Sequence, residues 1–206
     1  MTLVQACDFA EYAWDHSDVY DEKTDTHVSF QQDGTTLYVL FRGSESFQNA
    51  LDDLEFLRRD WKGYSVADGF ADCYDGVEAG IEAKIAEVKP AVVIYVGHSL
   101  GAFLALLGVI SSLKLGRAAA GYGIGCPRGL GRVSAIRLRK KLENIFTWYR
   151  NDQDIITHLA PSIFLTMHVG KKIQVGKWWR FWTALLPDEN NAHMVTQYRK
   201  NGGVDQ

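Results

Sequence analysis

The sequence lacks the features that mark membrane proteins, disulfide-rich secreted domains and metal sites. Among 206 residues there are three cysteines, Cys7, Cys73 and Cys126, an odd number without metal-ligand spacing. The longest apolar run, Ala102 to Ile110, is about half of the roughly 20 residues that cross a bilayer. No basic stretch followed by an apolar stretch stands at the N-terminus, so we expect no secretory signal. A cytoplasmic location is the default expectation, with non-classical export as the alternative.

An excess of positive charge is also missing. The chain has 22 Lys and Arg against 25 Asp and Glu, a formal net charge of -3, so a nucleic-acid partner is not expected. Its one basic cluster, Arg137 to Lys141, is interpreted as the solvated face of a helix. There are no repeats, low-complexity tracts or Pro/Ser-rich linkers, so residues 1–206 are expected to form a single domain with room for an enzyme core.

What the sequence does contain is an alternation of strand and helix patterns. Apolar residues at helical spacing over Asp68 to Val88 precede an apolar strand, Ala91 to Val96, and a helix, Leu100 to Leu113. This alternation predicts an α/β fold with a mostly parallel central sheet and helices on both faces. The other expected elements are helices at Leu3–Trp14, Arg132–Glu143 and His193–Arg199, strands at Ala118–Gly125 and Asn144–Tyr149, a hairpin of His27–Gln32 with Thr35–Phe41, and a second hairpin of Ile163–Val169 with Lys172–Val175 around Gly170.

The strand that ends at Val96 runs directly into Gly97-His98-Ser99-Leu100-Gly101, a G-x-S-x-G pattern that opens a helix. A strand–turn–helix context of this kind is typical of a nucleophile elbow, in which the serine stands above the carboxyl ends of the strands. The helix N-terminus then points at any oxyanion that forms. The pattern therefore indicates a nucleophilic Ser99, with a purely structural turn as the alternative.

A serine nucleophile needs a base, and the base needs an orienting acid, so the hypothesis requires a downstream Asp or Glu and then a His. Two carboxylates, Asp152 and Asp154, follow a predicted strand, and His158, His168 and His193 lie further on. Chain order alone leaves these alternatives open. The remaining histidines, His16, His27 and His98, are assigned no role as the base.

Several blocks of the sequence resemble the class 3 (fungal-type) triacylglycerol lipase family of α/β-hydrolases. In the family's order they are Phe41-Arg42-Gly43-Ser44-Glu45-Ser46, Asn49 with Asp53-Leu54, Val96 to Ala102, Gly125-Cys126-Pro127-Arg128, Asp154 to Leu159, and the terminal H-x(4)-Y from His193 to Tyr198. The resemblance implies that Ser99 is the nucleophile, Asp154 the acid and His193 the base. It also implies an oxyanion hole made of the backbone N–H groups of Ser44 and Leu100.

The resemblance is incomplete at two positions, where Ala67 and Ala50 replace a family histidine and tryptophan, and only Phe47 to Arg59 leaves room for a lid. It implies a serine carboxylic-ester hydrolase, a lipase or esterase, that needs no cofactor and no metal. Expected partners are lipid or small acyl-ester substrates, with peripheral contact with a lipid surface and no transmembrane segment. The alternatives are a thioesterase or amidase that uses the same three residues, and a non-catalytic binding protein on the same fold.

Overall fold

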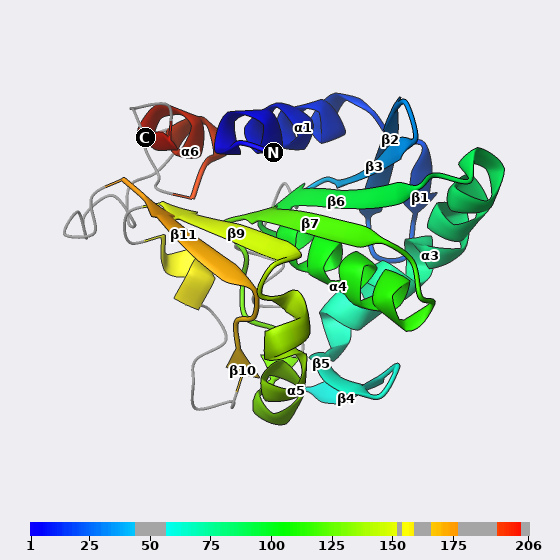
Figure 1. Ribbon diagram of the computed structural model, residues 1–206. Coiled ribbons are helices and arrows are strands. Elements are labelled where there is room, and N and C mark those ends of the chain that lie inside the picture. Colours follow the sequence, from blue (N-terminus) through cyan, green and yellow to red (C-terminus); the bar gives the residue numbers. More distant parts are fainter. Residues whose placement is uncertain (44–56, 152–153, 159–165, 177–192, 203–206) are drawn as a thin grey trace.

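The chain folds around a mostly parallel sheet. The structure is a computed structural model and describes residues 1–43, 57–151, 154–158, 166–176 and 193–202 (Figure 1). In this part of the chain, seven strands form one sheet in the order β1-β2-β3-β6-β7-β9-β11. Neighbours from β3 to β11 are parallel, and β1 and β2 form the antiparallel edge. The strands are β1 (Val19–Asp21), β2 (Thr26–Asp33), β3 (Thr36–Phe41), β6 (Val92–His98), β7 (Ala119–Ile124), β9 (Phe146–Asn151) and β11 (Lys171–Val175).

Helices cover both faces of this sheet, as the sequence predicts (Figure 1). Helices α1 (Leu3–Asp15) and α6 (Val195–Gly202) pack side by side on one face, and α3 (Asp68–Val88) and α4 (Leu100–Lys114) lie on the other. In β6, Val93 and Tyr95 join the core on the α3 and α4 side, whereas Val96 joins the core on the α1 and α6 side. This two-sided burial is why β6 is a continuous apolar run rather than an alternating one.

A second, smaller sheet lies on the α4 side of the molecule and was not expected from the sequence. Its order is β10-β8-β5-β4, and all its pairs are antiparallel. Helix α5 (Arg132–Leu142) packs against β5, β8 and β10, at the bottom of the view in Figure 1. The strands are β4 (Arg58–Trp61), β5 (Tyr64–Ala67), β8 (Leu130–Gly131) and β10 (Thr166–Met167).

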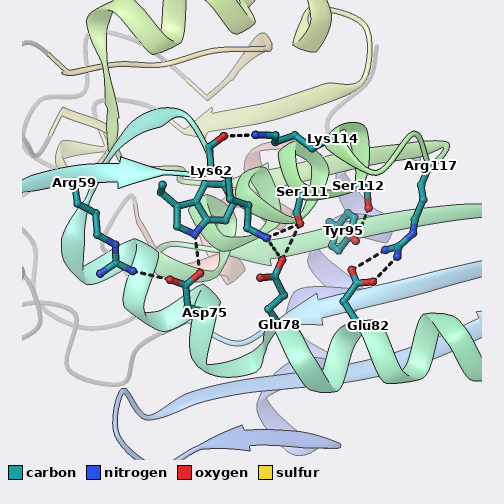
Figure 2. Close-up of polar contacts among 11 residues, drawn as sticks. Arg59, Lys62, Asp75, Glu78, Glu82, Tyr95, Ser111, Ser112, Lys114 and Arg117 are labelled. Atoms are coloured by element: carbon teal, nitrogen blue, oxygen red, sulfur yellow. Dashed lines mark hydrogen bonds and ion pairs between the residues drawn. The ribbon is translucent and has the colours of Figure 1, made fainter.

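Half-buried polar side chains fasten the β4–β5 hairpin to the helices of the main core (Figure 2). The Arg59 guanidinium pairs with Asp75 of α3 at 2.6 Å. Between the two strands, Lys62 pairs with Glu78 of α3 and donates to Ser111 of α4 at 3.1 Å. The hairpin, α3 and α4 are thereby joined by charge-assisted hydrogen bonds, which are stronger than neutral ones.

The predicted hairpin around Gly170 is wrong. β10 pairs with β8 in the small sheet, whereas β11 pairs in parallel with β9, as in Ile173 opposite Tyr149. Gly170 lies where the chain passes from one sheet to the other. Its φ is +85°, and a Cβ there would lie 2.4 Å from the Phe146 carbonyl oxygen, so this position requires glycine. Two extended segments joined by a glycine look like a hairpin in sequence whether or not they pair. Residues 163–165, which begin this predicted hairpin, and most of the lid stretch lie outside the described residues.

Candidate active site

Ser99 occupies the sharp turn between β6 and α4. Its backbone has φ 58° and ψ -124°, a conformation that an L-residue adopts only when the surroundings enforce it. A Cβ on Gly97 would lie 2.2 Å from the carbonyl oxygen of Gly101, and one on Gly101 would lie 2.5 Å from that of Phe41. Both glycines are therefore required by close backbone contacts, as the G-x-S-x-G pattern predicts.

The structure brings Asp154 and His193 together. Asp154 follows β9 and is fully buried, and His193 lies just before α6 and is only 9% exposed. The Nδ1 atom of His193 lies 2.9 Å from Oδ2 of Asp154. The rival His168 is engaged elsewhere, with its Nε2 at 2.8 Å from the Thr157 carbonyl oxygen. Asp152 and the His158 side chain lie outside the described part of the structure.

Asp154 is surrounded by donors. Besides His193, its Oδ2 accepts from the Tyr198 hydroxyl at 2.6 Å, and its Oδ1 accepts from the Ile156 N–H at 2.9 Å. Burial alone would raise the pKa of Asp154, but the His193 ring and these hydrogen bonds outweigh burial and lower the pKa below its usual value. Asp154 is therefore a carboxylate that can only accept, so His193 Nδ1 carries the proton. The other ring nitrogen, Nε2, is then the atom that can accept a proton.

The Asp154–His193 pair and Ser99 share neighbours. Ser99 donates its N–H to the Ile124 carbonyl at 2.9 Å, and the next residue, Gly125, faces the pair. A Cβ on Gly125 would lie 2.9 Å from the His193 ring and 3.0 Å from Asp154 Oδ2. Ser99 is 2% exposed, and its Oγ makes no hydrogen bond to any residue that the structure describes. The elbow and the pair therefore meet at the carboxyl ends of β6, β7 and β9.

His98 joins the elbow to the loop that carries the base. Its Nε2 lies 2.7 Å from the His193 carbonyl oxygen, and the two rings are 4.6 Å apart between centroids. Because a carbonyl only accepts, Nε2 of His98 carries the proton. Burial lowers the pKa of His98 to about 3, so the ring is neutral at ordinary pH.

Of the two predicted oxyanion donors, the structure describes Leu100 but not Ser44. Leu100 is the first residue of α4, so its N–H belongs to the helix N-terminus, where the partial positive charge of the helix lies. Ser44 lies outside the described residues. Its neighbour Gly43 contacts the elbow, since a Cβ there would lie 3.2 Å from the His98 carbonyl oxygen.

Sequence reasoning missed the contacts made by Tyr198 and His98. The terminal H-x(4)-Y pattern contained the signal for Tyr198, because five positions in a short loop and helix bring the tyrosine back to the acid. His98 gave no such signal, since its partner lies 95 positions away. Among the described residues, no cluster of three or more His, Cys, Asp or Glu could hold a metal ion.

The parallel sheet, the strained serine at a strand-to-helix turn and the buried Asp–His pair at the carboxyl edge together define the α/β-hydrolase fold. Residues 38–164 match the profile of the lipase (class 3) family. The chain therefore belongs to this family, as the sequence blocks indicate.

Known relatives agree with this assignment. A lipase from Rhizomucor miehei is 28% identical over 165 residues, which cover 75% of this chain and 45% of that protein. A lipase structure from Rhizopus microsporus var. chinensis has 26% identity and a TM-score of 0.65, covering 80% of this chain and 63% of the other. A triacylglycerol lipase structure from Penicillium expansum, at 17% identity, shares the fold with a TM-score of 0.70 over 84% of this chain and 78% of the other. The chain thus spans under half the length of its curated relative.

Proposed function

We propose that this protein is a serine hydrolase of carboxylic esters, a lipase or esterase. The observation that carries the proposal is the buried pair of Asp154 and His193, 2.9 Å apart, beside the elbow that holds Ser99. Membership of the lipase (class 3) family supports the ester bond as the target. In this proposal Ser99 is the nucleophile, His193 the general base and acid, and Asp154 the residue that orients it.

In the first half of the reaction, Ser99 Oγ attacks the acyl carbon and His193 Nε2 takes the hydroxyl proton. The negative charge of Asp154 stabilises the imidazolium that forms. Two neighbours restrain His193: Asp154 contacts Nδ1, and His98 donates to the backbone carbonyl. The base therefore keeps its orientation while its charge changes.

The tetrahedral oxyanion lies at the N-terminus of α4, where the Leu100 N–H donates to it. The N–H of Ser44 is the proposed second donor. Loss of one such donor costs about 10² to 10³ in kcat. His193 then protonates the leaving alcohol, and water repeats the sequence on the acyl-enzyme with no cofactor.

Acyl esters of lipids are the proposed substrates, because solved structures with this fold include triacylglycerol lipases. One solved structure of the same fold is a fungal lipase–inhibitor complex described as a model for interfacial activation. We extend this to the chain as a proposal that it acts on esters presented at a lipid surface. None of the described helices is long and apolar enough to span a membrane.

Hydrolysis of p-nitrophenyl esters from acetyl to palmitoyl, with and without detergent micelles, tests the proposal. Ser99→Ala is expected to lower kcat by about 10⁶-fold, whereas Ser17→Ala, an exposed serine, should leave it unchanged. A fluorophosphonate probe followed by peptide mass spectrometry should label Ser99 alone. The best chain length and any activation by micelles then choose between esterase and lipase.

Three results would contradict the proposal. Full turnover by the folded Ser99→Ala protein would place the nucleophile elsewhere. Probe labelling of Ser99 without ester turnover at any chain length would transfer the activity to thioesters or amides. A folded protein with neither labelling nor turnover would be a binding protein on this fold.

A further inference from the structure

The solvent-facing side of helix α5 combines two aliphatic side chains with five basic ones. Of its residues, Val133 is 71% exposed and Ile136 is 59% exposed, one helical turn apart. At 3.6 residues per turn, these two and Lys140 lie along the middle of the exposed face. Arg137 and Lys141 flank them on one side; Arg132 and Arg139 flank them on the other. We call these seven residues the α5 face.

The five basic residues of the α5 face have no acidic partner within the described part of the chain. None of them forms an ion pair with any residue that the structure describes, and the helix itself contains no Asp or Glu. Arg137 instead contacts the Gly63 carbonyl oxygen at 3.4 Å and lies over the Tyr64 ring at 5.5 Å. By contrast, several basic groups elsewhere in the described part of the chain are paired with acids, as in Arg117 with Glu82 and Lys62 with Glu78.

The charge of the face opposes that of the rest of the chain. Five of the 22 Lys and Arg residues stand in α5, so the remaining 17 are set against 25 Asp and Glu, a net charge of -8 outside the helix. A helix of charge +5 on such a background is a strongly polarised feature, and it fits an anionic partner.

We propose that the α5 face docks on an anionic lipid surface. Binding to the phosphates of a nucleic acid needs only cations. The α5 face instead places two exposed aliphatic side chains in the middle and cations at the margins. That order suits a helix lying in the plane of a membrane interface, with aliphatic side chains inserted among the acyl chains and lysine and arginine at the headgroups. The choice of lipid over an acidic protein rests on the proposed function, because an ester hydrolase of lipids works at such a surface.

The face also lies within reach of the candidate active site. Gly125, which faces the Asp154–His193 pair, stands seven positions before Arg132 in the chain. Even a fully extended connection would keep the start of α5 within about 25 Å of the pair. Docking through α5 would therefore keep the candidate active site within about 25 Å of the start of the docked helix.

Binding to vesicles of ether-linked lipids tests the docking surface apart from catalysis, because these lipids contain no carboxylic ester. Co-sedimentation with neutral phosphatidylcholine vesicles is compared with vesicles that also contain phosphatidylserine. The variants are Arg139→Gln/Lys140→Gln/Lys141→Gln and Val133→Ser/Ile136→Ser. A control of equal charge change on exposed lysines outside α5 is Lys23→Gln/Lys89→Gln/Lys200→Gln. Turnover of a water-soluble ester without vesicles is measured for each variant.

Wild type is expected to bind the anionic vesicles at least tenfold more tightly than the neutral ones. The α5 charge variant should lose about 100-fold, at roughly fivefold for each cation removed, and the aliphatic variant about tenfold. The control should lose less than about fivefold, and all variants should keep soluble-ester turnover.

Equal binding to both vesicle types, or equal losses in the α5 variant and the control, would overturn the proposal. Binding to DNA or to an acidic protein that depends on Arg139, Lys140 and Lys141, without vesicle binding, would also overturn it and reassign the face. If wild type does not hydrolyse the soluble ester, the proposed function is contradicted. If wild type hydrolyses the ester but does not bind anionic vesicles, only the docking surface is contradicted.

Discussion

Asp154 illustrates how single residues set the chemistry of the site. It is fully buried, yet three donors hold its charge: the His193 ring, the Tyr198 hydroxyl and the Ile156 N–H. A buried carboxylate without such partners would take up a proton and release the histidine. The donors therefore keep Asp154 ionised, which fixes the tautomer of His193.

Asp154→Asn is expected to lower kcat by about 10⁴-fold with an intact fold, because an amide can present a donor to His193 Nδ1 and favour the wrong tautomer. Steady-state kinetics and thermal unfolding check both parts. Asp152→Asn is the matched control, since Asp152 was the rival acid in the sequence. If the Asp152 variant loses activity and the Asp154 variant retains it, the assignment of the acid is wrong.

His98 makes stability depend on pH. Its pKa is about 3 in the fold, and the ordinary value is 6.5, so below pH 6.5 the unfolded chain binds a proton that the folded chain refuses. The contribution of neutral His98 to stability is therefore fully present above about pH 6.5 and is lost as the pH falls toward 3. Between pH 6.5 and 4.5 the expected loss of unfolding free energy is about 2 to 3 kcal/mol.

Urea unfolding of wild type and His98→Gln at pH 7, 6, 5 and 4.5 measures this loss. Glutamine has a similar reach and does not titrate, so the variant should show the shallower pH dependence. Asp154, whose pKa is lowered, loses its contribution only at still lower pH and does not interfere. Parallel curves for the two proteins would show that His98 is not responsible.

The candidate site could be predicted only in part from the sequence. Ser99 is defined by local neighbours, since strand, glycines and helix all lie within a few positions. Asp154 and His193 are 39 positions apart, and nothing local distinguishes them from Asp152 or His168. The family resemblance supplied the choice, and the structure adds the contact between them.

At the scale of elements, α6 has two faces with different tasks. Tyr198 points inward to Asp154, and the adjacent Arg199 reaches outward to Asp8 and Glu11 of α1 at 2.7 and 2.6 Å. The contact is close at the end of the helix as well, where a Cβ on Gly202 would lie 2.1 Å from a Leu3 methyl group. Helix α1 thus holds α6, and with it the Tyr198 hydroxyl that donates to Asp154, in place.

Arg199→Gln should loosen this contact. The Arg199 side chain is 36% exposed, so solvent screening limits the effect to about 1 kcal/mol, or a melting temperature about 2 to 4 °C lower. A few-fold loss of kcat at unchanged KM is expected, because Tyr198 moves with the helix. Lys200→Gln, which removes the neighbouring exposed cation, is the control. Equal melting temperatures and rates in both variants would show that the ion pairs do not position α6.

Most elements could be predicted because their patterns are local. The helix expected at Asp68–Val88 has those bounds in the structure, and the strand and helix that flank Ser99 are also confirmed. The second hairpin is wrong because hydrophobic alternation marks a segment as extended and says nothing about its partner. The four-residue strands β4 and β5 were missed since their charged and aromatic residues show little alternation.

At the scale of the whole molecule, the candidate site is assembled from distant parts of the chain. The contact between His98 and His193 spans 95 positions, whereas β6, which leads into the elbow, pairs with β3 and β7 over 56 and 26 positions, as in Thr36 opposite Val92 and Val93 opposite Ala119. Long loops cost entropy to close, so long-range contacts tend to form late in folding. We therefore expect α6 to dock after the sheet has formed.

Refolding from urea should show this order. Far-UV circular dichroism is expected to recover before ester turnover, because sheet and central helices form before α6 docks. Stopped-flow dichroism and a turnover assay on the same sample measure the two rates. Superimposable recoveries would mean that α6 docks together with the sheet.

The position of His193, so far behind Ser99, also matters while the chain is being made. A ribosome adds about 5 to 20 residues each second, so Ser99 leaves it roughly 5 to 20 seconds before His193 does. Because a serine without its proton acceptor is a poor nucleophile, the proposed mechanism predicts that the nascent chain stays inactive until His193 has been added.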